Sequence, residues 1–336
     1  MAELDKAQRL VINQLLDHAV FTSSVSTSMS ELEIRARRVY QSPLGQQRIN
    51  GWFARSFGFV PQSYRDNWLW LAGPNRLSVT EVRILLATLK AVINTPAAQG
   101  VEADRVIATQ PIVTAVRSVV PELGDRQINK VIHQLFVDRF GLLIPDTPEV
   151  NDEENSTVDE YWDVATDFVP IAQLLVQSMQ QSLKADVPAI TPIQRVNAYL
   201  LKFRSMTPKL GALWQTLQEN KQAIADLWVP LQRFYLEVGD DYALLLDANR
   251  RQLKSRQYFV AIAVARSLGA GVANGDLGRR IAQLSEQLYP NESVNPSFVR
   301  EELRNNALAY QDNDYWVATA VASRFAITLE DKTNGE

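Results

Sequence analysis

Apolar residues recur at intervals of three and four positions along most of this 336-residue chain, the spacing that gathers side chains on one face of an α-helix. One such stripe near the start contains Leu10, Val11, Leu15 and Ala19. Another follows the capping box Ser78–Glu81 and contains Val82, Leu85, Leu86 and Leu89. Further helix starts are marked by a cap residue before proline at Thr191-Pro192, Thr207-Pro208 and Asn295-Pro296. The pattern predicts a mainly α fold with roughly a dozen helices.

Strand-like runs are few, and the clearest two, residues 140–144 and 161–165, flank a single loop. That loop, residues 145–160, carries seven acidic residues and no basic one, so we expect it to be solvated. Before it, Gly124-Asp125 opens a predicted helix with an apolar stripe formed by Ile128, Val131, Ile132, Leu135 and Phe136. A middle helix is expected around residues 112–119.

From Ser78 onward, the predicted order is therefore helix, helix, helix, strand, loop, strand. This order resembles that of the winged-helix superfamily. The resemblance implies that the polar face of the last helix enters the major groove, where its contacts would come from Arg126, Asn129, Lys130, His133 and Gln134. The acidic loop would then be the wing, and its carboxylates would repel phosphates. We therefore expect a protein partner at the acidic wing.

Three regions follow from these patterns. Residues 1–75 form a helical arm or subdomain rich in arginine and aromatic residues, residues 76–166 form the winged-helix-like unit with its wing at 145–160, and residues 167–330 form an all-helical C-terminal domain. No repeat of fixed period is found in the sequence. The predicted fold class is thus mainly α, with a small β-hairpin in the N-terminal half.

Charge is segregated along the chain, although its formal net charge is only −4. Residues 34–65 contain six arginines and no acid, interleaved with aromatic residues such as Trp52, Phe53 and Phe57. Such a composition suits a surface that neutralises phosphates and stacks on bases. The alternative is structural, because buried aromatic residues form cores and arginines commonly pair with carboxylates elsewhere in a chain.

Two more basic tracts occupy residues 187–218 and 248–280. If the three tracts converge on one face, they would form a positive groove despite the negative net charge. The residues expected to contact nucleic acid are Arg35, Arg38, Arg48, Arg55, Arg126, Lys130, Arg250, Arg251, Lys254 and Arg256. The glycine-rich stretch at residues 269–278 follows a predicted helix and has no Walker lysine, so we interpret it as a helix–helix connection.

Signals for catalysis are sparse. The chain has no cysteine and two histidines, His18 and His133, neither beside a nucleophile motif. The Asp312–Asp314 stretch does not match a calcium loop, and Glu330–Lys332 matches only the tail of a nuclease triplet. We therefore expect no catalytic residue, metal site or cofactor.

The sequence favours a non-enzymatic nucleic-acid-associated protein, a nucleoprotein-type binder or accessory subunit that contacts the backbone of DNA or RNA. The alternative is a protein–protein adaptor or structural subunit of a larger assembly, without direct nucleic-acid contact and possibly forming homo-oligomers. We expect neither a leader peptide nor a membrane span, and a cytoplasmic location.

Overall fold

The computed structural model describes residues 3–22, 29–64, 67–71, 77–99, 105–146, 161–184, 189–249 and 255–325. These residues are mainly helical, as predicted, and their strands form small antiparallel sheets. Backbone contacts divide the chain into two compact units. The first unit contains residues 1–54 and 58–189, and the second contains residues 55–57 and 190–336.

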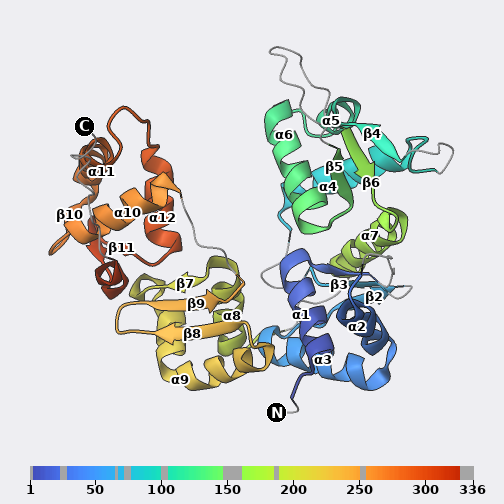
Figure 1. Cartoon of the computed structure of the whole chain (residues 1–336), viewed down its shortest axis with the longest axis horizontal. Coiled ribbons are helices and arrows are strands. Elements are labelled where there is room, and N and C mark those ends of the chain that lie inside the picture. The colour runs from blue at the N-terminus through green and yellow to red at the C-terminus, as the bar shows by residue number, and fades with distance from the viewer. Residues whose placement is uncertain are drawn as a thin grey trace, which may run out of the picture. The chain divides into compact units, whose positions relative to one another are not determined.

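One order of elements, namely helix, strand, helix, helix, strand, strand, occurs four times in the described residues, and in the third occurrence the second and third helices are merged into one kinked helix. Each time, the three strands form an antiparallel sheet in which the last strand lies between the other two. We term these occurrences modules 1 to 4, at residues 6–69, 79–164, 192–247 and 256–318. Modules 1 and 2 lie in the first unit, except for residues 55–57, and modules 3 and 4 lie in the second (Figure 1).

Module 1 comprises α1 (Lys6–His18), β1 (Val20–Phe21), α2 (Glu31–Gln41), α3 (Pro43–Phe57), β2 (Gln62–Tyr64) and β3 (Asn67–Leu69). Its helix starts are set by local chemistry, because the N-cap side chains of Asp5, Ser30 and Ser42 each accept a hydrogen bond from a backbone N–H of the first turn. The region expected to be a helical arm therefore also contains a sheet.

Module 2 comprises α4 (Val79–Ile93), β4 (Val106–Ala108), α5 (Thr109–Arg117), α6 (Asp125–Ile132), a π-helical continuation (His133–Arg139), β5 (Leu143–Asp146) and β6 (Tyr161–Val164). The predicted capping box before α4 is confirmed by hydrogen bonds in both directions between Ser78 and Glu81. Both predicted strands and the middle helix are also confirmed, with bounds shifted by up to three residues.

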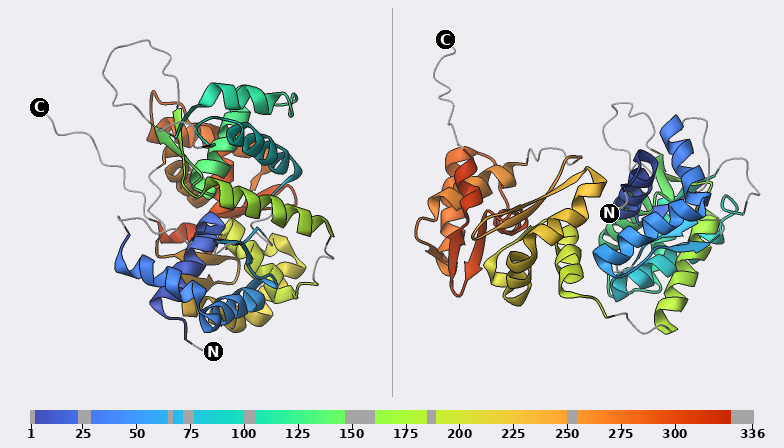
Figure 2. Two further views of the ribbon diagram at one scale, coloured as in Figure 1. Left: turned by 90° about the vertical axis from the view of Figure 1, so that its right-hand side faces the viewer. Right: turned by 90° about the horizontal axis from the view of Figure 1, so that it is seen from below.

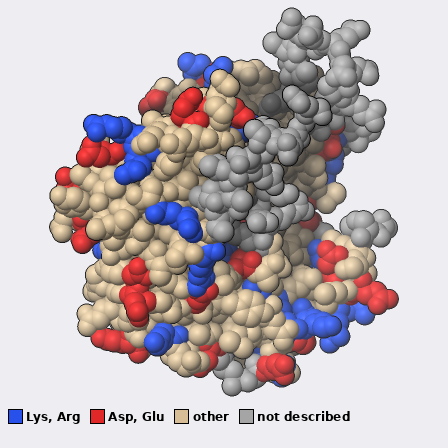
Figure 3. All heavy atoms as spheres, turned by 60° about the vertical axis from the view of Figure 1, so that its left-hand side comes forward, with Lys and Arg blue, Asp and Glu red and all other residues tan. Residues whose placement is uncertain are grey.

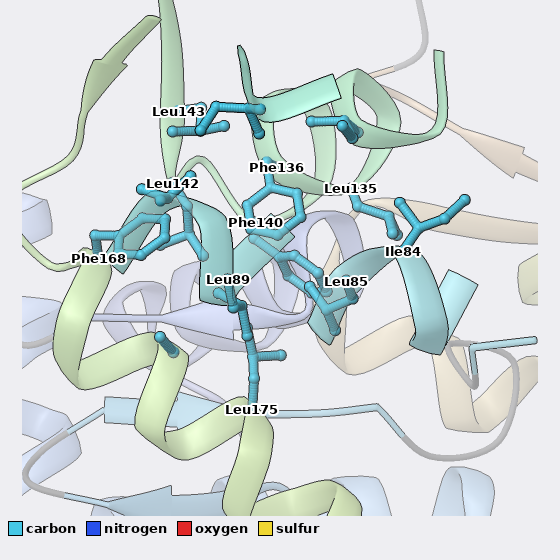
Figure 4. Close-up of a cluster of buried hydrophobic side chains, with 14 of the residues drawn as sticks. Ile84, Leu85, Leu89, Leu135, Phe136, Phe140, Leu142, Leu143, Phe168 and Leu175 are labelled. Atoms are coloured by element: carbon cyan, nitrogen blue, oxygen red, sulfur yellow. The ribbon is translucent and has the colours of Figure 1, made fainter. Parts of the chain in front are cut away.

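The core of the first unit gathers buried side chains from α4, the π-helical turns, β5 and the following helix α7 (Phe168–Lys184), as Figure 4 shows. Phe136 and Phe168 stack with their ring centroids 6.5 Å apart. Ala19, Val20 and Leu69 of module 1 belong to the same core, so modules 1 and 2 share one apolar interior.

Module 3 comprises α8 (Pro192–Phe203), β7 (Ser205–Met206), α9 (Ala212–Trp228), β8 (Phe234–Val238) and β9 (Ala243–Asp247). Its second and third helices are joined in α9, which has non-helical backbone at Asn220 (φ −121°, ψ 19°). The sheet runs along one side of α8 and α9 (Figure 2).

Module 4 comprises α10 (Arg256–Ser267), β10 (Val272–Ala273), α11 (Asn274–Leu288), α12 (Pro296–Asn305), β11 (Ala309–Asp312) and β12 (Tyr315–Ala318). Module 3 is joined by polar contacts to the 3₁₀ turn η5 (Ala320–Arg324), which follows module 4: Arg324 pairs with Glu237, and Asp241 accepts a hydrogen bond from the backbone N–H of Ala320 at 3.1 Å. Tyr242 of module 3 lies in the core of module 4.

The prediction of an all-helical C-terminal domain is wrong, because β7 to β12 lie within residues 167–330. These strands have two to five residues, which is too short for periodicity to separate a strand from a buried helical turn. The interpretation of residues 269–278 as a plain helix–helix connection is likewise incomplete, since β10 and the first turns of α11 occupy that stretch.

Candidate nucleic-acid interface

The arginine-rich run of module 1 divides into buried and exposed side chains along α2. Arg37 is 7% exposed, its guanidinium lies 5.5 Å from the ring centroid of Phe21, and its Nη1 donates to the Glu33 carbonyl at 3.2 Å. Burial lowers the pKa of Arg37, although the nearby Glu33 and Asp167 oppose that shift. Arg37 therefore holds α2 in the fold rather than serving as a contact for a ligand.

Arg35 and Arg38 lie one turn apart on α2, and both are exposed. Arg35 is within 4.0 Å of Asp5 but keeps 67% of its side chain exposed, so this contact neutralises little of its charge. On α3, Arg48 is half-buried and Arg55 is exposed, and Arg55 belongs to the second unit. Module 1 thus carries Arg35 and Arg38 on α2 and Arg48 on α3.

Three aromatic residues of the same run do not line this surface. Trp52, Phe53 and Phe57 are at most 1% exposed. Phe53 packs at 5.1 Å from Trp52 and 4.8 Å from Trp70, measured between ring centroids. The structural alternative is therefore confirmed for these rings, and base stacking on them is excluded in this conformation.

Module 2 presents the clearest polar stripe. Arg126, Lys130, His133 and Gln134 are exposed along α6 and its π-helical continuation, while Ile128 and Ile132 on the opposite side are fully buried. Asn129, the fifth residue expected on this face, is half-buried. At the start of α6, Asp125 Oδ1 lies 3.2 Å from Nη1 of Arg117 on α5, so this ion pair connects the two helices. The sequence pattern therefore predicted both faces of this helix.

Arg38, Arg48, Arg55, Arg126 and Lys130 share one property: none of them has an ion-pair partner within the described part of the chain. Their charges are thus available to a ligand of opposite sign. His133 differs, since its Nδ1 lies 3.4 Å from Asp138 Oδ2 and a protonated imidazole would pair with that carboxylate.

The basic tracts of the second unit are paired only in part. Arg204 lies 3.8 Å from Asp247, Arg256 pairs with Glu292, and the exposed Arg279 pairs with Asp276. Within the described residues of these tracts, no ion pair is formed by Arg195, Lys202, Lys209, Arg266 or Arg280. The predicted contacts Arg250, Arg251 and Lys254 lie outside the described residues. Arg256 therefore has a structural partner, which the sequence could not reveal because Glu292 is far along the chain.

Charges on the third helix of each module differ between the units. In the first unit, α3 carries Arg48 without an acid, and α6 exposes Arg126 and Lys130; Arg55, at the end of α3, belongs to the second unit. In the second unit, the half of α9 after Asn220 has one lysine and one aspartate, and α12 has two arginines and two glutamates. Basic and acidic groups also lie next to one another over the face drawn in Figure 3.

The equivalence of α3 and α6 was missed in the sequence, because only module 2 showed the helix-helix-helix-strand order. The module intervals are unequal, so no period marks the repeat.

In the described ranges, no cluster of three or more histidine or carboxylate side chains has the geometry to hold a metal ion. Across those same ranges, none of the helices is both long and apolar enough to cross a membrane.

No protein-family model matches the chain, and neither the curated proteins nor the solved structures include a significant match.

Proposed function

We propose that the four modules are winged helices and that the chain is a non-enzymatic nucleic-acid-associated protein, in which the first unit contacts the phosphate backbone. The observation that carries this proposal is the exposed face of α6, where Arg126 and Lys130 have no ion-pair partner in the described residues and stand on the third helix of module 2. In winged-helix DNA binders, this helix is the one that enters the major groove.

The recurring element order supports the winged-helix assignment, and so does the sheet order, in which the last strand of each module lies between the first and the second. The charge distribution supports the choice of unit. Basic residues outnumber acidic ones on α3 and α6, whereas the half of α9 after Asn220 and α12 carry both signs in equal number. The second unit is accordingly the part suited to protein contacts.

Binding through exposed arginines and lysines gives an affinity that falls steeply with salt and depends little on base sequence. The test is fluorescence anisotropy with single-stranded RNA, single-stranded DNA and duplex DNA, each titrated at several salt concentrations. The double variant Arg126→Gln/Lys130→Gln should weaken binding and reduce the slope of log affinity against log salt by about two for duplex DNA, because each lost phosphate contact removes about 0.9.

A matched control is Lys209→Gln/Lys221→Gln, which removes the same charge from exposed positions in the second unit. This control should retain the affinity and slope of the unmodified protein. Equal losses in both double variants would show that only net charge matters. Absence of binding to all three nucleic acids at low salt would reject the proposal.

One observation favours the adaptor function as a second candidate. Val79, Leu86 and Ile93 are 80%, 41% and 40% exposed and recur every seven residues, so they share one side of α4. An exposed apolar stripe with this spacing is typical of a helix that packs against another protein. If this stripe is an interface, substitution of its central residue should change the assembly state, whereas nucleic-acid binding at α6 should be unaffected.

A further inference from the structure

The second unit contains a cavity of about 590 Å³ at the junction of modules 3 and 4. Its wall is formed by the end of α8, the segment entering β8, the end of β9 and one side of α12. The lining residues are Lys202, Phe203, Arg204, Arg233, Asp247, Asn249, Glu301 and Asn305. A volume of this size is typical of sites for small molecules.

The floor of the cavity is a buried charge cluster. Arg233 donates two hydrogen bonds to Asp247, at 2.7 Å from Nε and 2.8 Å from Nη2, and both side chains are less than 10% exposed. Burial by itself would raise the pKa of Asp247, but the hydrogen bonds from Arg233 and from the Asn249 backbone outweigh burial and lower it. The Asp247 carboxylate is therefore charged and forms a hydrogen-bonded ion pair with Arg233.

Arg204 brings a second guanidinium to the same carboxylate, with Nη2 at 3.8 Å from Asp247 Oδ2. Arg204 and Arg233 also lie over the ring of Phe234, at 4.9 and 4.6 Å from its centroid, which fixes both groups in place. Two guanidinium groups thus lie beside one carboxylate in this wall of the cavity. Planar guanidinium groups are suited to binding a phosphate.

The mouth of the cavity combines a cation with an aromatic ring. Lys202 is exposed, and its Nζ lies 5.3 Å from the ring centroid of Phe203, which is itself 41% exposed. Glu301 is the second acid of the lining, and Asn249 and Asn305 provide amide groups. Among the described residues that line the cavity, Lys202, Arg204 and Arg233 are basic and Asp247 and Glu301 are acidic.

We propose that this cavity binds a nucleotide, with its phosphate near Arg204 and Lys202 and its base against Phe203. The ligand needs a negative group for the guanidinium floor, a planar apolar face for the exposed ring and polar edges for the two amides, and a nucleotide carries all three. This proposal concerns the second unit and does not depend on nucleic-acid binding by the first.

The test is isothermal titration calorimetry of the full-length chain with AMP, adenosine, inorganic phosphate and a ten-residue oligothymidylate. AMP should bind at least tenfold more tightly than adenosine or phosphate, because only AMP engages both the cations and the ring. Lys202→Gln and Phe203→Leu should each weaken AMP binding at least fivefold. Lys209→Gln, an exposed lysine outside the cavity, should bind AMP as the unmodified chain does.

Competition identifies the source of the nucleotide. Displacement of AMP by the oligothymidylate indicates a nucleotide within a strand, and failure to displace AMP indicates a free nucleotide. Absence of AMP binding at millimolar concentration overturns the proposal, as does AMP binding that is unchanged in both cavity variants. The Arg126→Gln/Lys130→Gln variant should retain AMP binding, so failure at this cavity and failure at α6 are separable.

Discussion

Trp228 donates its indole N–H to the side-chain oxygen of Asn197 at 3.0 Å, and Asn197 is fully buried. The amide nitrogen of Asn197 in turn donates to the Ser56 carbonyl at 3.1 Å. All three residues belong to the second unit, in which Phe57 also packs edge-to-face on Trp228 with 5.9 Å between ring centroids. One buried amide therefore links the first helix of module 3, its third helix and the last turn of α3.

Replacing this amide with an apolar side chain of similar size tests its importance. Asn197→Leu leaves a buried indole N–H without its acceptor and removes the donor to Ser56, so we expect the free energy of unfolding to fall by about 2–4 kcal/mol. Denaturant unfolding followed by tryptophan fluorescence measures this change. The exposed neighbour Arg195→Leu should change stability by less than about 0.5 kcal/mol. An equally small effect of Asn197→Leu would show that the hydrogen bonds of Asn197 do not stabilise the fold.

The contact between module 3 and η5, the 3₁₀ turn after module 4, should weaken in acid because it depends on the charge of Glu237. The hydrogen bond from Arg324 lowers the pKa of Glu237, and Tyr242 reinforces the shift by donating to Glu237 Oε1 at 2.7 Å. A lowered carboxyl pKa stabilises the fold above the unfolded value of about 4.3. That stabilisation is lost as the pH falls through the folded pKa.

Glu237→Gln removes the titrating group and keeps the shape of the side chain. At neutral pH, the unmodified protein should be more stable than this variant, by no more than about 1 kcal/mol because the pair is partly exposed. The difference should vanish once the pH is well below 4, where both side chains are neutral. Thermal unfolding across that pH range measures it, and a difference that persists in acid would exclude Glu237 as its source.

Substitution of Arg37 should affect stability, whereas substitution of its neighbour Arg38 on α2 should affect nucleic-acid binding. Arg37→Ala removes a buried side chain over Phe21 and should lower stability by about 1–3 kcal/mol without changing the salt dependence of nucleic-acid binding. Arg38→Gln alters an exposed residue and should leave stability unchanged while reducing the salt slope by up to about one. Unfolding curves measure the stability of both variants, and anisotropy titrations measure the salt slope of nucleic-acid binding. A salt slope lowered by Arg37→Ala but not by Arg38→Gln would make Arg37, and not Arg38, the nucleic-acid contact.

The exposed stripe of α4 makes a prediction about assembly. Leu86→Glu places a charge at the centre of the stripe formed with Val79 and Ile93, so any oligomer built on that stripe should dissociate. Light scattering coupled to size-exclusion chromatography measures the mass as a function of concentration. Leu246→Glu is a comparable change at an exposed position of module 3 and should not alter the mass. A larger mass that survives Leu86→Glu would place the interface elsewhere.

The candidate interface was predictable in part. On α6, local periodicity alone placed Ile128 and Ile132 inside and left Arg126 and Lys130 outside. On α2, the sequence did not separate Arg37 from Arg38, because burial of an arginine depends on Phe21, which belongs to another element. The partner of Arg256 was hidden for the same reason, since Glu292 lies 36 positions further along the chain.

Local chemistry in the sequence determined most helices and their starts. Ser78, Thr191 and Asn295 each accept the predicted hydrogen bond from the first turn, because a cap involves residues that are adjacent in the chain. Apart from β5 and β6, which the sequence predicted, only the tertiary structure decided the strands and the modules. Two-residue strands such as Val20–Phe21 and Val272–Ala273 exist because β3 and β12 pair with them from distant positions, and no local pattern encodes that pairing. The fourfold recurrence is thus a property of the packing, visible only once each third strand lies between its two partners.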